Sequence, residues 1–223
     1  MTKNKQLFLL VLFIIFSVLE IAGELFQNNW LTFIFKPLLI PSLYLVYFFQ
    51  EKTVEKWIQI ALLFSFLGDT LLLFSPQNEL FFLLGLGAFL IAQSSYVYVF
   101  NKDRIKKRFP KKLIAFVLLF FLLGIGTLFY FILPTLGDFT IPVIVYATAV
   151  AAMGIFATLR FKSVSSSSYN FTLIGALLFI VSDTFIALDK FFFNENLAYA
   201  SVIIMTLYIL GQYLIVRGRT NLV

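Results

Sequence analysis

The sequence has 223 residues and a mean hydropathy of +0.97; 61% of the residues are hydrophobic and 13% are charged. Soluble domains are about 45–50% apolar and about one quarter charged, so this composition excludes a soluble fold. Between the charged clusters, almost every stretch is apolar for about 20 residues, the length of a membrane-spanning helix. We therefore predict an all-α, polytopic membrane helix bundle that forms a single transmembrane domain over residues 1–223.

Two residue types that carry much enzyme chemistry are absent, since the chain contains no cysteine and no histidine. This excludes disulfides, thiol nucleophiles, Ser-His-Asp chemistry and the usual zinc sites. The net charge of +6 would suggest nucleic acid in a soluble protein, but here the basic residues lie in short segments between apolar runs, where they act as topology signals. We expect no nucleic-acid partner, no metal and no cofactor.

Eight transmembrane helices are predicted from the apolar runs, at about residues 6–24, 30–49, 57–75, 80–100, 112–134, 140–159, 171–189 and 197–216. The first run has an alternative interpretation as a signal peptide, because Lys3 and Lys5 precede 13 apolar residues that end at Leu19. The apolar character continues to Phe26 without an Ala-x-Ala cleavage site, which favours a membrane span.

Lysine and arginine predict the orientation. If the helices alternate in direction, 15 of the 17 fall on one side, and the positive-inside rule makes that side cytoplasmic. Both termini are then cytoplasmic, and the chain is a multi-pass integral membrane protein, of the inner or plasma membrane if bacterial. The 15 residues are Lys3, Lys5, Lys52, Lys56, Lys102, Arg104, Lys106, Lys107, Arg108, Lys111, Lys112, Arg160, Lys162, Arg217 and Arg219.

The two remaining lysines are candidates for function. Lys36 lies inside the second span, directly before Pro37, where a cation is costly unless it is paired or meets water. Lys190 closes the seventh span at the outer rim, where it could equally snorkel to water. We expect Glu20 and Glu24, near the same rim, to be solvated.

Two intramembrane aspartates give the strongest signal. Asp69 and Asp183 each lie about 12 residues into a span, so a rise of about 1.5 Å per residue puts both about 18 Å from the cytoplasmic ends of their helices. An ionised carboxylate is excluded from lipid at that depth, so both should face the interior. The sequences that lead to them are weakly similar, and a parallel repeat would bring the two acids face to face.

Other polar residues within the spans are Gln93, Tyr146, Tyr208 and Gln212. Interhelical hydrogen bonds would explain each of them alone. Each of them also belongs to a short sequence motif, and these motifs follow one another along the chain in a fixed order.

The ordered motifs of the second to eighth helices resemble the lysoplasmalogenase family, also called YhhN-like. One departure concerns the fourth helix, where the family usually has a histidine and this chain has Gln93. A titrating group is lost there, although glutamine still donates and accepts hydrogen bonds. The sequence leaves open whether this departure changes the bond or substrate acted on. The motifs are Lys36-Pro37-Leu38, Gly68-Asp69, Phe81-x-x-Gly85-x-x-x-Phe89 continuing to Tyr96, Tyr146 to Met153, Gly175 to Phe179 followed by Ser182-Asp183, and Tyr208-x-x-x-Gln212.

The resemblance implies hydrolysis of the vinyl-ether bond of a lysoplasmalogen, which releases a fatty aldehyde and a glycerophospho-ethanolamine or glycerophosphocholine. Two buried carboxyl groups suit this chemistry, because a carboxylic acid can protonate the β-carbon while a second carboxyl stabilises the oxocarbenium ion or positions water. On this interpretation Asp69 and Asp183 are catalytic. Residues proposed to bind the phosphate, the glycerol or the water are Lys36, Gln93, Tyr146, Lys190, Tyr208 and Gln212.

Two other classes also use intramembrane carboxylates. A proton-coupled transporter or lipid flippase would keep buried acids and a lysine, and helices broken by glycine or proline would favour it. An intramembrane aspartyl protease resembles the chain only at Gly68-Asp69, and no Pro-Ala-Leu segment follows. The partners expected here are a lysophospholipid substrate and membrane lipid. The sequence leaves open the headgroup, the chain length, the oligomeric state and which aspartate is the acid.

Overall fold

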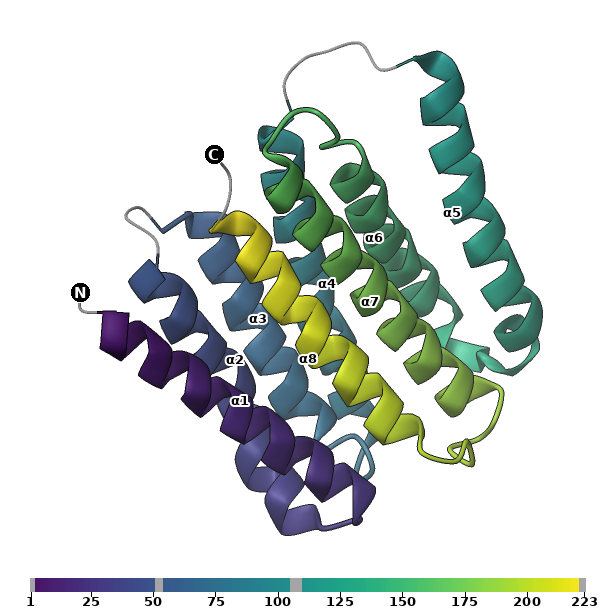
Figure 1. Ribbon diagram of the computed structural model, residues 1–223. Helices are drawn as coiled ribbons and strands as arrows, with labels where there is room; N and C mark the ends of the chain where they lie inside the picture. The colour runs from purple at the N-terminus through teal and green to yellow at the C-terminus, as the bar shows by residue number, and fades with distance from the viewer. Residues whose placement is uncertain (1–2, 51–53, 105–109, 221–223) are drawn as a thin grey trace. The chain divides into compact units, whose positions relative to one another are not determined.

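The computed structural model describes residues 3–50, 54–104 and 110–220. These residues form eight α-helices and two short 3-10 helices, with no strand among them (Figure 1). The all-α prediction is confirmed. The helices are α1 (Lys3–Leu25), α2 (Asn29–Gln50), α3 (Lys56–Leu72), α4 (Glu79–Lys102), α5 (Lys111–Ile132), α6 (Thr140–Thr158), α7 (Ser166–Phe191) and α8 (Ala200–Arg219), and the 3-10 helices are η1 (Leu133–Thr135) and η2 (Gly137–Phe139).

Short polar side chains begin several of these helices. Asn28 accepts hydrogen bonds from the backbone N–H groups of Trp30 and Leu31, and Asn78 accepts one from Leu80. The hydroxyl of Ser165 accepts from the N–H of Ser168, which begins α7 at Ser166. Capping of this kind satisfies N–H groups that have no partner inside the helix, so these residues fix where α2, α4 and α7 start.

Seven of the eight helices are long and apolar enough to cross a membrane. The exception is α3, which ends at Leu72 after 17 residues, three residues before the predicted end of its span. The chain then turns over residues 73–77 before α4 begins. The predicted boundaries also differ for α7, which starts five residues earlier, and for α8, which starts three residues later.

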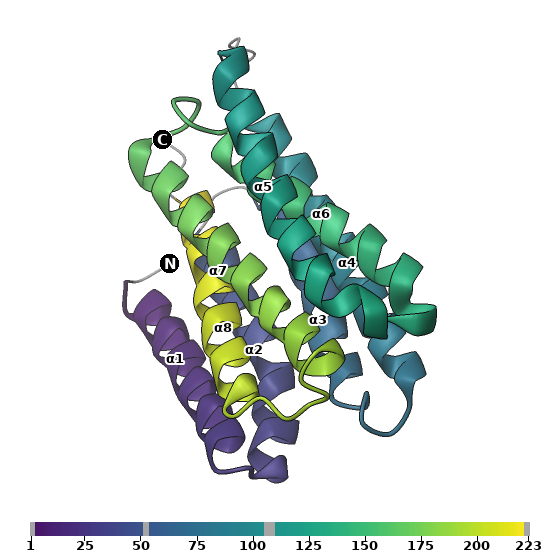
Figure 2. The same ribbon diagram turned by 90° about the vertical axis from the view of Figure 1, so that its right-hand side faces the viewer.

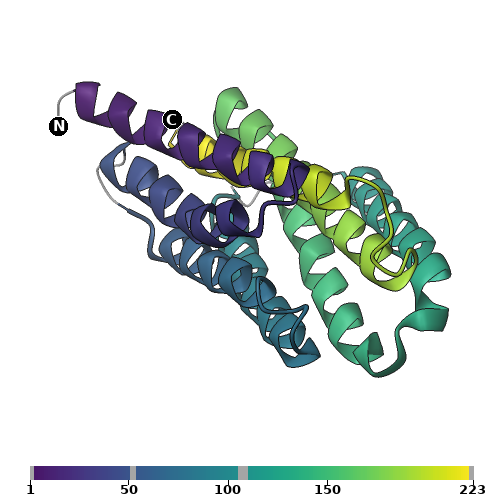
Figure 3. The same cartoon turned by 90° about the horizontal axis from the view of Figure 1, so that it is seen from below.

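The chain separates into two compact units, Met1–Tyr96 and Val97–Val223, which meet within α4. In the first unit α1 packs along α2, and α2 along α3 (Figure 3). Two glycines bring α3 and α4 together: a Cβ on Gly68 would lie 2.6 Å from the Phe89 ring, and one on Gly85 would lie 2.9 Å from the side chain of Leu72. The first unit is therefore an antiparallel set of closely packed helices.

The second unit is organised around α7, which packs against α5, α6 and most extensively α8 (Figures 1 and 2). The α7–α8 contact depends on small residues. A Cβ on Gly175 would lie 2.7 Å from the carbonyl oxygen of Gly211, and one on Gly211 would lie 2.9 Å from that of Gly175. Close approach of two backbones through glycine is a common device of membrane helix packing.

A buried ion-pair network ties the second unit together at one end. Arg160, which follows α6 and is fully buried, lies 3.0 Å from the carboxylate of Asp103 at the end of α4, and its guanidinium also donates to the Ser168 hydroxyl of α7. Arg219 at the end of α8 pairs with the same carboxylate. Burial lowers the pKa of Arg160 to about 10, against the opposing effect of Asp103, so the guanidinium stays charged at neutral pH.

Candidate active site

Asp69 lies near one end of the first unit, 13 residues after the first residue of α3 and three before its last. Its side chain is buried, and 3% of the residue is exposed. The preceding residue, Gly68, makes room for the ring of Phe89 from α4. Asp69 is thus held at a tight α3–α4 contact, away from lipid, as the sequence predicts.

Gln93 continues the stripe of α4 that faces α3. Gly85, Phe89 and Gln93 are spaced four residues apart, so they share one face of the helix, and the first two contact Leu72 and Gly68 of α3. Gln93 is fully buried, and neither its amide nitrogen nor its amide oxygen has a hydrogen-bond partner among the described residues. A buried amide without partners costs about 1–3 kcal/mol, so the conformation of Gln93 is favourable only if another group satisfies it.

The prediction that Glu20 and Glu24 are solvated is wrong. Glu20 is completely buried, and neither of its carboxylate oxygens accepts a hydrogen bond from the described residues. Glu24, one helical turn later, is mostly buried and pairs with Lys36. The reason is that α1 extends to Leu25 and packs along α2, which covers the face that carries both acids.

Lys36 meets this acidic pair from α2. Its ammonium group lies 3.5 Å from a carboxylate oxygen of Glu24, and 16% of each side chain is exposed. Lys36, Glu24 and Asp69 all act electrostatically on Glu20. One end of the first unit therefore gathers three carboxyl groups and one lysine from α1, α2 and α3.

Asp183 belongs to the second unit, 17 residues after the first residue of α7 and eight before its last. Counted from the start of its helix, it lies four residues deeper than Asp69, because α7 begins earlier than predicted. The hydroxyl of Tyr146 on α6 donates a hydrogen bond of 2.8 Å to its Oδ2 atom. Both residues line a cavity of about 460 Å³ that is bounded by α5, α6 and α7.

This cavity is almost entirely apolar apart from the Tyr146–Asp183 pair and two threonines, Thr127 and Thr184. Its apolar wall includes residues of α5 such as Phe121, whose ring lies where a Cβ on Gly154 would be. A small number of polar groups in an apolar cavity of this volume is typical of a ligand site. The arrangement suits a ligand with an aliphatic chain and one polar group that meets the carboxyl.

Tyr208 and Gln212 lie one turn apart on α8, and both are buried. The Gln212 amide donates to the Tyr208 hydroxyl at 3.5 Å, and the Tyr208 ring packs against Phe179 of α7 with centroids 5.4 Å apart. The neighbour of Asp183 is also fixed, since the Ser182 hydroxyl donates to the carbonyl oxygen of Ile204 on α8. The face of α7 next to the aspartate is therefore held by α8.

Lys190 lies one residue before the last residue of α7. Its ammonium group lies 3.5 Å from the carboxylate of Glu195 in the segment between α7 and α8. The adjacent Asp189 accepts a hydrogen bond from the N–H of Leu197 in the same segment. These contacts link the end of α7 to the segment that leads to α8, and the role of Lys190 in substrate binding stays a prediction.

The structure thus sorts the predicted residues into two groups. Lys36, Asp69 and Gln93 lie in the first unit, and Tyr146, Asp183, Lys190, Tyr208 and Gln212 lie in the second. Since each aspartate belongs to a different unit, their meeting in one cavity stays a prediction. Sequence analysis did not predict that Glu20 is buried near these residues. The signal was present, because Glu20, like Lys36, is a charged residue within an apolar run.

Comparison with known proteins identifies the family of this chain. Residues 31–219 match the model of the YhhN family, and this range includes all the predicted site residues from Lys36 to Gln212. The chain belongs to the YhhN family. The resemblance indicated by the ordered motifs is therefore confirmed, and α1, which carries Glu20 and Glu24, lies outside the matched range.

Curated relatives of this YhhN-family chain are named lysoplasmalogenases. It is 34% identical over 161 residues to lysoplasmalogenase TMEM86A of Bos taurus, a match that covers 70% of this chain and 62% of that protein. It is also 34% identical over 168 residues to the lysoplasmalogenase of Mycobacterium bovis, covering 74% of this chain and 60% of that protein. The chain thus spans about three-fifths of the length of these relatives. No solved structure matches it.

Proposed function

We propose that the chain is an integral-membrane hydrolase that cleaves the vinyl-ether bond of a lysoplasmalogen. The observation that carries this proposal is the similarity to relatives named lysoplasmalogenase, together with a family match over residues 31–219 that includes both intramembrane aspartates. The products are a fatty aldehyde and a glycerophospho-headgroup. An apolar cavity beside Asp183 supports a substrate with a single aliphatic chain.

The proposed mechanism uses the two aspartates as a pair. One carboxylic acid donates its proton to the β-carbon of the vinyl ether, which leaves an oxocarbenium ion. The other carboxyl group stabilises that cation and takes a proton from the water that attacks the α-carbon. The hemiacetal formed then collapses to the aldehyde and the glycerol hydroxyl, so atoms and protons balance without a metal.

The other polar residues are proposed to position the substrate. Tyr146 holds one oxygen of Asp183 through its hydrogen bond and so orients the carboxyl. Gln93, which is buried without partners among the described residues, is proposed to bind the glycerol or the water. Lys36 is proposed to meet the phosphate in addition to Glu24, and Tyr208 and Gln212 to line the site from α8.

The test is the release of fatty aldehyde from synthetic lysoplasmalogen by the protein purified in detergent. The matched controls are the ester lysophospholipid and the saturated ether, which a vinyl-ether hydrolase leaves intact. We expect Asp69→Asn and Asp183→Asn each to lower kcat at least about a hundredfold, with the double variant little worse, because residues of one catalytic unit are not additive. Full activity in either single variant would refute the mechanism.

A proton-coupled transporter or lipid flippase is the second candidate. The observations that favour it are the buried carboxyl of Glu20, whose oxygens have no hydrogen-bond partner among the described residues, and the two prolines, Pro37 and Pro41, inside α2. Sealed vesicles that contain the protein distinguish the two functions. A transporter moves protons or lipid across the bilayer and releases no aldehyde.

A further inference from the structure

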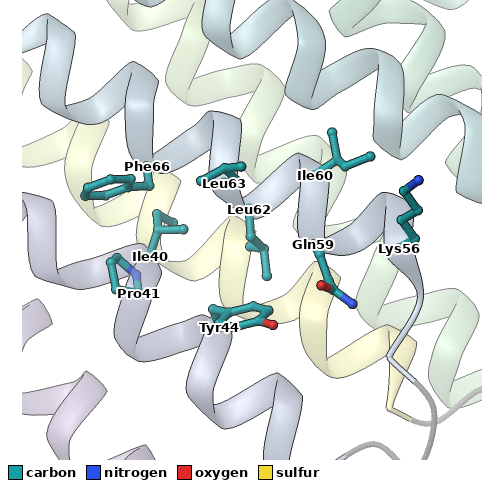
Figure 4. Close-up of a pocket in the computed structure, with 9 residues that line it drawn as sticks. All are labelled: Ile40, Pro41, Tyr44, Lys56, Gln59, Ile60, Leu62, Leu63 and Phe66. Atoms are coloured by element: carbon teal, nitrogen blue, oxygen red, sulfur yellow. The ribbon is translucent and has the colours of Figure 1, made fainter.

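A second cavity lies in the first unit, between α2 and α3, and no predicted site residue lines it. Its volume is about 520 Å³. Figure 4 shows its two ends: Lys56, Gln59 and the hydroxyl of Tyr44 lie at one end, and Ile40 and Phe66 lie at the other. The groove is therefore polar at one end and apolar along the rest of its length.

The length of this groove matches one leaflet of a bilayer. Lys56 and Phe66 are ten residues apart on α3, which corresponds to about 15 Å along the helix axis. The hydrocarbon core of a bilayer is about 30 Å thick, so the groove extends over about half of it. Lys56 is the first residue of α3 and is exposed, so its ammonium group lies at the level where α3 begins.

The groove opens towards the surroundings of the bundle, since Leu63, which lines it, is 54% exposed. Its back wall is sealed by buried residues such as Ile40 and Leu62. Pro41, in the middle of α2, contributes a backbone without an N–H donor to the wall. An aliphatic chain that lies in the groove would thus meet apolar side chains and no backbone donor at that point.

The side chains at the polar end of the groove favour an anionic ligand. Lys56 provides a cation, while Gln59 and Tyr44 provide neutral hydrogen-bond donors. None of the described residues that line the groove is acidic. Positive charge, two further donors and an apolar trough one leaflet long complement an anionic phospholipid, whose phosphate would meet Lys56 and whose acyl chain would lie against Ile60 and Phe66.

We propose that the α2–α3 groove is a binding site for one anionic phospholipid of the leaflet in which α3 begins, with its headgroup at Lys56. This site is separate from the proposed reaction centre and does not depend on the proposed activity. The lipid fills the space between α2 and α3 and stabilises their packing. The positive-inside rule assigns the leaflet to the cytoplasmic side.

The test measures which lipids the intact protein retains. The protein is reconstituted in phosphatidylcholine vesicles that contain phosphatidylglycerol, extracted in mild detergent, and analysed by native mass spectrometry. We expect the wild-type protein to retain phosphatidylglycerol in preference to phosphatidylcholine. Lys56→Met should reduce this preference about fivefold, the effect of one basic residue near an anionic surface.

Two further variants separate the site from general effects of charge. Lys111→Met removes an exposed lysine at the first residue of α5, outside the groove, and should retain lipid like the wild type. Ile60→Trp fills the groove and should reduce retention of both lipids. The proposal is overturned if Lys56→Met and Ile60→Trp retain lipid like the wild type, if Lys111→Met has the same effect as Lys56→Met, or if the wild-type protein retains no lipid.

Discussion

One end of the first unit brings several ionisable side chains together. Lys36 pairs with Glu24, while neither carboxyl oxygen of the fully buried Glu20 has a hydrogen-bond partner among the described residues. Burying an ionisable group is expensive, so a residue that is kept there at a cost in stability is a candidate for function. Ionisable residues inside membrane spans commonly mark functional sites.

The first residue-scale prediction concerns Lys36. Lys36→Met leaves Glu24 without its cation, so we expect the free energy of unfolding to fall by about 1.5–3 kcal/mol, the worth of a charged hydrogen bond. Thermal unfolding of the wild type and the variant in detergent measures this loss of stability. Adding Glu24→Gln to the same protein should recover much of the loss, because the carboxylate is then removed as well. An unchanged unfolding temperature together with a raised KM would instead show that Lys36 serves the phosphate alone.

Glu20 should behave in the opposite way. Glu20→Gln keeps the shape of the side chain and removes a buried ionisable group whose oxygens have no hydrogen-bond partner among the described residues, so we expect the unfolding temperature to stay the same or rise. A more stable protein with a lower kcat would be the mark of a residue kept for function. Glu24→Gln is the control, because it breaks an ion pair and should lower the unfolding temperature. A similar loss of stability in Glu20→Gln would contradict this account.

At the scale of elements, close packing of α7 on α8 holds the face of α7 that precedes Asp183. Gly175 and Gly211 allow the two backbones to approach, and the Ser182 hydroxyl bonds across to α8. A side chain at either glycine would collide with backbone atoms of the other helix. Backbone atoms move aside less easily than the end of a flexible side chain. The position of Asp183 on α7 is therefore coupled to the α7–α8 contact.

The glycines provide a matched pair of variants. Gly175→Ala places a Cβ 2.7 Å from a backbone oxygen of α8, so we expect it to destabilise the protein by about 1–3 kcal/mol and to lower activity. Gly126→Ala on α5 has open space around the new Cβ and should be neutral or slightly stabilising, since alanine favours the helix. Denaturation measures the stability of the two variants, and aldehyde release measures their activity. Equal effects would show that helix propensity, and not the α7–α8 contact, decides the outcome.

Most of these elements follow from hydropathy, because an apolar run of about 20 residues has few alternatives to a helix. The errors lie where polar residues decide a boundary: Ser165 caps α7 ahead of the apolar run, and α3 stops at Leu72 although Leu73 and Phe74 continue the apolar pattern. For the site, hydropathy identifies Asp69 and Asp183 as acids within membrane spans, and the structure buries Asp69 fully and Asp183 in part. Hydropathy does not identify the Tyr146–Asp183 hydrogen bond or the burial of Glu20, which depend on which helix faces which.

At the scale of the whole molecule, the proposed mechanism draws its two aspartates from both compact units. Asp69 lies in one and Asp183 in the other, and the chain passes from the first to the second within α4. The family match includes residues of both units. The proposed mechanism therefore depends on the two carboxyl groups lying within about 10 Å of each other, the separation used by paired acid catalysts.

The absence of cysteine from the natural sequence allows this separation to be tested directly. We expect the pair Asp69→Cys and Asp183→Cys to be joined within one chain by a bifunctional maleimide with a reach of about 10 Å, because both side chains should open into the same cavity. Mass spectrometry of the linked peptides measures the yield. The positive control is the pair Tyr146→Cys and Asp183→Cys, whose native side chains are hydrogen-bonded at 2.8 Å. If the control pair is linked and the aspartate pair is not, the two carboxyl groups do not share a cavity, and hydrolysis by a paired acid mechanism is ruled out.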